Sequence, residues 1–211
     1  MSATPAIVGS HEAHAEHAEV ELSFAERLRN NRLGIWLFCF SEVFLFGGLL
    51  MARFYLWIDP SSGAIVRPDL NQTLGLITTS VLLVSSLFMV LAETSIVHGD
   101  RQGMLRNLMI TGVLGIVFLI GVVGLEWGGE IHPGDGAFGA IFYGMTSLHA
   151  LHVLSGVFLI FVIWWNGRKG KFSADDHWGV EATAIYWHFV DVVWVFFYPA
   201  LYLIGQAVHI G

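Results

Sequence analysis

Eight carboxylates and imidazoles stand inside long apolar stretches of the sequence. They are Glu42, Glu93, Glu126, His149, His152, Glu181, His188 and Asp191. Side chains of these types can carry protons, pair across helices or bind a metal. In hydrocarbon they are costly and usually face a protein interior or water, so each is a candidate for function.

Pairing between helices is the simplest role for such groups. We favour it for Glu126, His188 and Asp191, because buried acids and imidazoles in helix bundles often pair with one another. Glu42 is different, since it is an isolated acid among aromatic residues and packing alone does not explain it. Its aromatic neighbours in the sequence are Phe38, Phe40, Phe44 and Phe46.

A metal or haem site is the alternative chemistry. His149 and His152 lie one helical turn apart, and His188 could supply a second axial ligand to a haem from another helix. A stable metal site needs more convergent ligands than these. The single cysteine, Cys39, excludes internal disulfides and cysteine-rich metal sites. We therefore expect no catalytic residue, metal or cofactor in this chain, with a stand-alone haem or metal enzyme as the alternative.

Transmembrane helices are the elements that must position these side chains. Hydrophobic residues make up 55% of the chain and charged residues 13%, against about 25% charged in soluble domains. A bilayer core needs about 20 apolar residues per helix. Five segments meet this requirement, at residues 33–57, 72–97, 105–127, 138–165 and 182–208. The prediction is an all-α, polytopic membrane protein, with a five-helix domain over 31–211 after a tail, 1–30, that is partly disordered or forms an interfacial helix.

The positive charges predict the orientation. Eight of the ten Lys and Arg residues fall on the side of the N-terminus, and only Arg53 and Arg67 fall on the other. This bias places the N-terminus in the cytoplasm and the C-terminus outside. The tail is too polar for a secretory signal and too acidic for a mitochondrial transit peptide, so we expect a multi-pass protein of the bacterial plasma membrane. The net charge of −7 argues against nucleic acid as a partner.

The tail also carries three histidines at a spacing of three, His11, His14 and His17. They could bind a metal, but a solvated, partly helical or disordered segment is the favoured interpretation.

Residue spacing predicts where the polar groups point. In the second segment they recur every seven positions and form one stripe that must face other helices or a cavity. They are Gln72, Thr79, Ser86 and Glu93. In the fifth segment Glu181, His188 and Asp191 fall within an arc of about 80°. Counted from the segment ends, Glu42 lies two turns in from the cytoplasmic side and His152 lies near mid-membrane. The third segment has three glycines that would allow close helix approach: Gly121, Gly124 and Gly128.

The stretches that bear these residues resemble, in order, subunit III of the haem-copper terminal oxidases. They are WLFCFSEVFLFGG (36–48), NQTLGLITTSVLLVSS (71–86), GLEW (124–127), TSLHALHVLSG (146–156), and HWGVEA (177–182) followed by AIYWHFVDVVWVFFYPALYLIG (184–205). The family often has Gly where Ser147 and Ala150 stand, and Gln where Val123 stands. The chain resembles the short, five-helix form that lacks the first two helices.

The resemblance implies a subunit without a redox centre. In this family subunit III packs against subunit I, which holds the haems and copper, and subunit II docks the electron donor. The complex reduces oxygen and pumps protons, while subunit III stabilises subunit I, holds structural phospholipid and supports proton uptake. By resemblance, Glu42 is the buried glutamate of the lipid cleft. The other polar cleft and interhelical positions match Glu93, His149, His152, Glu181 and His188.

Several alternatives stay open. Cytochrome c is the favoured electron donor of the complex, with quinol as the alternative and a nitric-oxide-reductase-associated homologue as a minor option. A proton-coupled transporter using Glu42 and Glu93 would typically show inverted repeats and broken helices, and neither is visible in the sequence.

Overall fold

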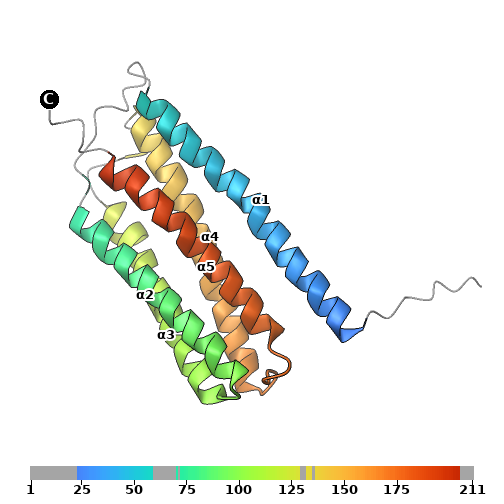
Figure 1. The fold of residues 1–211 in the computed structure, drawn as a ribbon. Coiled ribbons are helices and arrows are strands. Elements are labelled where there is room, and N and C mark those ends of the chain that lie inside the picture. The colour runs from blue at the N-terminus through green and yellow to red at the C-terminus, as the bar shows by residue number, and fades with distance from the viewer. Residues whose placement is uncertain (1–22, 59–69, 71, 129–131, 135, 205–211) are drawn as a thin grey trace, which may run out of the picture.

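The computed structural model describes residues 23–58, 70, 72–128, 132–134 and 136–204. Within these ranges it consists of helices joined by turns and short loops, without strands (Figure 1). The helices are α1 (Phe24–Ile58), α2 (Gln72–Val97), α3 (Arg101–Leu119), α4 (Gly136–Arg168) and α5 (Trp178–Tyr198). Short π-helical segments, Ile120–Glu126 and Pro199–Leu203, continue α3 and α5. Five helices are long and apolar enough to cross a membrane. The predicted all-α class with five membrane-length helices is confirmed.

Helix α1 begins earlier than the apolar stretch does. The Ser23 hydroxyl accepts a hydrogen bond from the Glu26 backbone N–H at 3.3 Å, and the Glu26 carboxylate accepts one from the Ser23 N–H at 2.9 Å. This reciprocal capping box satisfies free N–H groups at the helix start. Residues 24–32 therefore run straight into the membrane segment, and Glu42 lies near the middle of α1. The tail histidines, His11, His14 and His17, lie outside the described residues.

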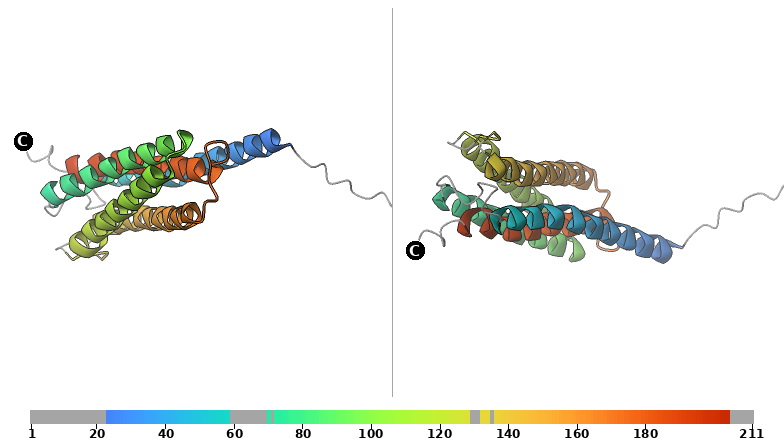
Figure 2. Two further views of the ribbon diagram at one scale, coloured as in Figure 1. Left: turned by 90° about the horizontal axis from the view of Figure 1, so that it is seen from below. Right: turned by 90° about the horizontal axis from the view of Figure 1, so that it is seen from above.

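The helices form a bundle in which α5 lies among α2, α3 and α4, while α1 runs along α4 and α5 at one edge (Figures 1 and 2). The first turns of α1 extend away from the other helices (Figure 2). We call the end where α1 begins, α2 turns into α3 and α4 passes into α5 the basic end. Its cationic residues are Arg27, Arg29, Arg32, Arg101, Arg106, Arg168, Lys169 and Lys171.

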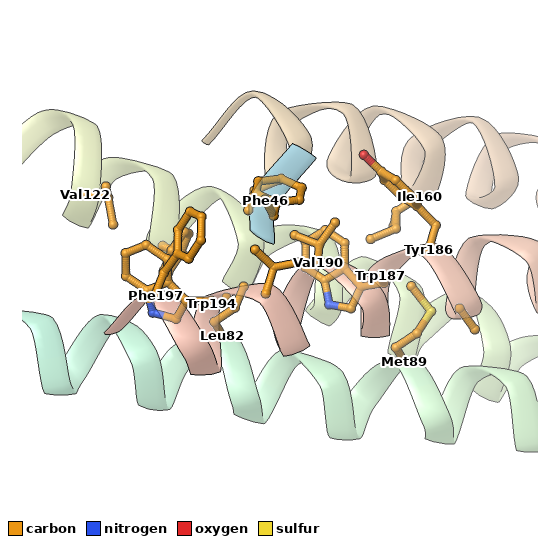
Figure 3. Close-up of a cluster of buried hydrophobic side chains, with 14 of the residues drawn as sticks. Phe46, Leu82, Met89, Val122, Ile160, Tyr186, Trp187, Val190, Trp194 and Phe197 are labelled. Carbon is orange, nitrogen blue, oxygen red and sulfur yellow. The ribbon is translucent and has the colours of Figure 1, made fainter. Parts of the chain in front are cut away.

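The core is organised around two tryptophans of α5, Trp187 and Trp194, which are essentially inaccessible to solvent. Their indole nitrogens face α2 (Figure 3). Trp187 donates to the Ser85 hydroxyl at 3.0 Å, and Trp194 donates to the Thr79 hydroxyl at 2.9 Å. Because a buried indole N–H needs an acceptor, these two bonds fix the rotation of α5 against α2.

Glycines on α3 and α4 make room for Trp187. A Cβ atom would lie 2.7 Å from its ring at Gly115 and 2.8 Å from it at Gly156. Gly121 likewise faces α2, because a Cβ there would lie 2.4 Å from the Thr78 methyl carbon. The predicted close approach is therefore confirmed at Gly121. It is wrong at Gly124 and Gly128, where a Cβ would meet only atoms of its own helical segment.

Gly156→Ala tests whether the space that this glycine leaves for the Trp187 ring is needed. The added methyl group collides with the Trp187 ring, and overpacking of this kind costs about 1–3 kcal/mol. The expected result is a lower free energy of unfolding, measured by SDS titration of the protein in mild detergent with tryptophan fluorescence as the signal.

Gly144→Ala is the matched control on the same helix, because a Cβ at Gly144 would have no neighbour within 4 Å. Equal stability of the two variants would contradict the claim that Trp187 needs the space left by Gly156.

Candidate functional site

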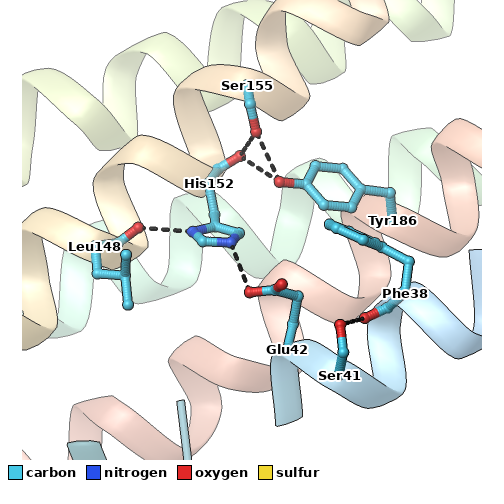
Figure 4. A network of polar contacts seen from close by, with 7 residues as sticks. All are labelled: Phe38, Ser41, Glu42, Leu148, His152, Ser155 and Tyr186. Carbon is cyan, nitrogen blue, oxygen red and sulfur yellow. Dashed lines mark hydrogen bonds and ion pairs between the residues drawn. The ribbon is translucent and has the colours of Figure 1, made fainter. Parts of the chain in front are cut away.

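An acid and an imidazole meet where α1 crosses α4. The Nε2 atom of His152 lies 3.3 Å from the Glu42 Oε2 atom, and both side chains are largely buried, at 15% and 17% exposed (Figure 4). The other ring nitrogen of His152, Nδ1, lies 2.8 Å from the carbonyl oxygen of Leu148, one turn earlier on α4. The structure thus brings together two of the predicted site residues.

These contacts determine how many protons the pair holds. A carbonyl oxygen only accepts hydrogen bonds, so Nδ1 of His152 carries a proton. The contact between Nε2 and Glu42 then needs one further proton, which lies either on the imidazole, giving an ion pair, or on the carboxyl, giving a neutral pair. In both cases the pair as a whole is uncharged and holds one exchangeable proton between two helices.

Hydroxyl groups extend this contact to α5. The Ser155 hydroxyl donates to the backbone carbonyl of His152 at 2.8 Å and lies 2.7 Å from the Tyr186 hydroxyl. Tyr186 also reaches that carbonyl, at 3.3 Å (Figure 4). On the other side, the Phe46 ring stands edge-on to the His152 ring at 4.7 Å. One polar network therefore joins α1, α4 and α5.

The contact with His152 places Glu42 at the level of the middle of α4. Because α1 begins at Phe24, before the apolar stretch, Glu42 also lies near the middle of its own helix.

His149 does not share this site, although it precedes His152 by one turn. It is fully buried, and neither ring nitrogen has a hydrogen-bond partner within the described part of the chain. Its ring stacks on that of Trp194, with centroids 4.8 Å apart. Further aromatic rings surround it at 5.7–6.4 Å: Phe46, Phe118 and Phe197. These rings fill the space that a haem bound to His149 would need.

The polar stripe of α2 faces α5, as its seven-residue repeat predicts. Gln72 donates to the backbone carbonyl of Tyr202 at 3.2 Å, and the Ser86 hydroxyl lies 2.6 Å from Nδ1 of His188. Asp191 is buried beside Ser86. His188 of α5 therefore contacts a hydroxyl of α2.

Glu181 and Glu93 belong to the basic end. Arg32 of α1 donates from two nitrogens to the two carboxylate oxygens of Glu181, at 2.8 and 2.9 Å. This bidentate pair joins α1 to the start of α5. Glu93 is half-buried and within electrostatic reach of Glu181 and His177. The remaining predicted residue, Glu126, ends the π-helical segment, and its side chain lies outside the described part of the structure.

Comparison with known proteins identifies the family. The family model for cytochrome c oxidase subunit III matches residues 23–206. The chain belongs to this family. Cytochrome c oxidase subunit 3 of Equus caballus and that of Bos taurus are each 36% identical to it over 182 residues, which cover 83% of this chain and 70% of the relative. The protein of Dasypus novemcinctus is 35% identical over the same length. The resemblance seen in the motifs is confirmed.

Within this subunit III homologue, sequence reasoning missed the hydroxyls that complete the network. Ser155 follows His152 by three residues and so lies on nearly the same face of α4, which is a signal that spacing could have supplied. Tyr186 directly precedes Trp187 and His188 on α5, but nothing in the sequence indicates that its hydroxyl reaches α4.

A double-mutant cycle on Glu42→Ala and His152→Ala tests the central pair. Removing either partner leaves the other polar group buried and unpaired, so the two changes are not additive. We expect a coupling energy of about 0.5–3 kcal/mol in SDS unfolding, unchanged by added salt because the pair is shielded from solvent. Additive single changes would contradict the contact.

The same cycle on Arg32→Ala and Glu181→Ala gives the contrasting case. The Arg32 side chain is 51% exposed, and exposed pairs contribute about 0.2–1 kcal/mol. We expect this smaller coupling to fall further as salt is raised. A salt-independent coupling would show that the pair is shielded when the protein lies in detergent.

Proposed function

We propose that this chain is the non-catalytic subunit III of a respiratory haem-copper oxygen reductase. It stabilises subunit I, holds lipid and supports proton uptake, and cytochrome c is the electron donor of the complex. The protein lies in a bacterial plasma membrane, with the basic end towards the cytoplasm in accordance with the excess of Lys and Arg there. The observation that carries the proposal is the Glu42–His152 pair in a chain of this family.

The proton count of the pair supports a role in proton uptake. An uncharged pair with one exchangeable proton can persist in hydrocarbon, where a lone charge is costly. Losing that proton leaves a negative charge, and gaining one leaves a positive charge. The contact between α1 and α4 is therefore sensitive to proton supply from the cytoplasmic side.

Two apolar grooves flanking α1 support a role in holding lipid. One, of about 280 Å³, lies between α1 and α5 and is lined by Val43, Gly47, Leu50, Phe189, Val192 and Phe196. The other, of about 380 Å³, lies among α1, α4 and α5 and is lined by Ile35, Phe38, Ser155, Leu159, Ala182 and Tyr186. Both adjoin the helices that meet at Glu42, so acyl chains in them would pack against the polar network.

We further propose that the haems and copper belong to partner subunits. Within the described residues, no three His, Cys, Asp or Glu side chains gather in a group that could hold a metal ion. His149, the best-placed candidate ligand for a haem, is enclosed by aromatic rings, and His188 is engaged with Ser86.

Affinity purification of the tagged chain from its native membrane in mild detergent tests this function. The expected result is co-purification of a larger subunit with a haem spectrum and with oxygen reduction driven by cytochrome c. Oxygen reduction driven only by quinol would show that the complex is a quinol oxidase. A haem or copper spectrum in the isolated chain would instead support a stand-alone redox enzyme and overturn the proposal.

Glu42→Gln tests the role of the pair in the assembled complex. The amide keeps the shape and a hydrogen bond to His152 but cannot exchange a proton, so assembly should be nearly intact while lipid retention or the turnover lifetime changes. Glu42→Ala should cost more, because it leaves a void and an unpaired imidazole. If Glu42→Gln matches the wild type in both lipid retention and turnover lifetime, the pair only holds the helices together.

A further inference from the structure

A long apolar groove runs between α3 and α4, on the side of the bundle away from α1. Near the basic end it is lined by Leu108, Gly112, Val113, Val157, Phe161 and Trp164. Farther along it widens to about 590 Å³ between the π-helical segment after α3 and the middle of α4, where Gly124 and Ala150 line it. Ile116 borders both stretches, which follow one another along the two helices, and we call them together the α3–α4 groove.

Cationic side chains gather at the basic end of this groove. Arg168 follows Trp164 by one turn of α4, and its guanidinium lies over the Trp164 ring at 4.9 Å. Lys169 lies in the same way over Trp165, at 5.3 Å. Arg106 is exposed on the first turns of α3, about half a turn before the groove residue Leu108.

A further cation, Arg101, lies at the basic end of the groove, between the start of α3 and the end of α4. Its guanidinium donates to the backbone carbonyls of Gly167 and Arg168, at the C-terminal end of α4. These bonds hold the ends of α3 and α4 together.

None of these four cations pairs with a carboxylate among the described residues. The two acid–base pairs recorded there, Arg32–Glu181 and Glu42–His152, both involve α1. The positive charge at the end of the groove is therefore available to an external anion.

We propose that the α3–α4 groove binds an anionic phospholipid, with its phosphate between Arg106 and Arg168 and an acyl chain along the groove. This deepens the proposed lipid-holding function and rests on it for the orientation in the membrane. Basic sites between helices at the cytoplasmic surface recognise anionic head groups, and guanidinium groups suit phosphate oxygens. The charge pattern favours this groove over those beside α1. Arg168 lies over Trp164, which lines the α3–α4 groove. On α1, by contrast, Arg32 is bound to Glu181, and Arg27 and Arg29 lie on the first turns, which extend away from the other helices (Figure 2).

The shape of the groove fits a chain that ends within the membrane. Gly112 and Gly124 keep its wall low on the α3 side, and Trp127 borders the far end, where its indole nitrogen donates to the Thr146 hydroxyl at 3.2 Å. The groove is thus charged at one end, apolar along its length and bounded by an aromatic ring at the other.

Native mass spectrometry of the full chain tests the head-group site. The protein is equilibrated with equal amounts of phosphatidylglycerol and phosphatidylcholine of identical acyl chains, and the retained lipids are counted. We expect at least threefold more phosphatidylglycerol on the wild type. The double variant Arg106→Gln and Arg168→Gln should retain both lipids about equally, while the matched pair Arg27→Gln and Arg29→Gln on α1 keeps the wild-type preference. No preference in the wild type, or an equal loss in the control, would overturn the proposal.

Gly112→Leu tests the acyl-chain part with the cations intact. It should reduce retained phosphatidylglycerol at least threefold while the SDS unfolding midpoint stays near that of the wild type; if the fold is lost, Val113→Trp fills the same stretch. Unchanged retention in a folded variant would overturn the proposal that the acyl chain lies in the groove. Displacement of the lipid by inorganic phosphate would overturn it too, because only the phosphate would then be recognised. Both measurements use the chain without its partners, so a negative result here leaves untouched the co-purification of a haem-bearing subunit, which tests the proposed function.

Discussion

The rotation of α5 is the constraint on which the rest of the bundle depends. In hydrocarbon no water is available to an indole N–H, so Trp187 and Trp194 must find acceptors on another helix, and Ser85 and Thr79 of α2 are those acceptors. Once these tryptophans face α2, the directions of the neighbouring side chains on α5 are determined as well. His188 reaches Ser86 on the same side, while Tyr186 turns towards α4 and meets Ser155. The polar contacts of three helices thus follow from two hydrogen bonds.

Helix α1 is held in a different way from the others. Most of its large apolar side chains are exposed, for example Leu37 at 68% and Phe44 at 68%. In a membrane this carries little penalty, since lipid tails are as apolar as the side chains, and so apolar burial contributes little to docking. Its specific attachments include Phe46 in the core, the Glu42–His152 pair and the Arg32–Glu181 pair. Near the other end of α1 the buried Arg53 guanidinium lies over the Phe138 ring of α4 at 5.1 Å. The position of α1 therefore depends on polar contacts more than that of α5, which packs on several helices.

Much of this could be predicted from sequence, and the exceptions have physical causes. Apolar length predicts the five helices, and the seven-residue repeat predicts the face of α2. The start of α1 at Phe24 falls in the stretch for which a partly disordered tail or an interfacial helix was expected, because a capping box can begin a helix in polar sequence, before the apolar stretch. The different surroundings of His149 and His152 could not be predicted, since residues three apart differ by only about 60° around a helix. Which of them meets Glu42 depends on how α1 crosses α4, and no local pattern encodes that crossing.

The pairs Arg32–Glu181 and Glu42–His152, which α1 makes within the described part of the chain, are matched to their surroundings. Taking a charged group out of water costs on the order of several kcal/mol per ion. A permanent ion pair is therefore best placed where water remains. Arg32–Glu181 satisfies this, because Arg32 lies at the exposed basic end and its guanidinium cannot give up its proton. At the buried level of Glu42 the partner is an imidazole instead, which can be neutral if the carboxyl takes the proton. Histidine at position 152 thus allows the deep contact to avoid charge altogether, whereas arginine there would not.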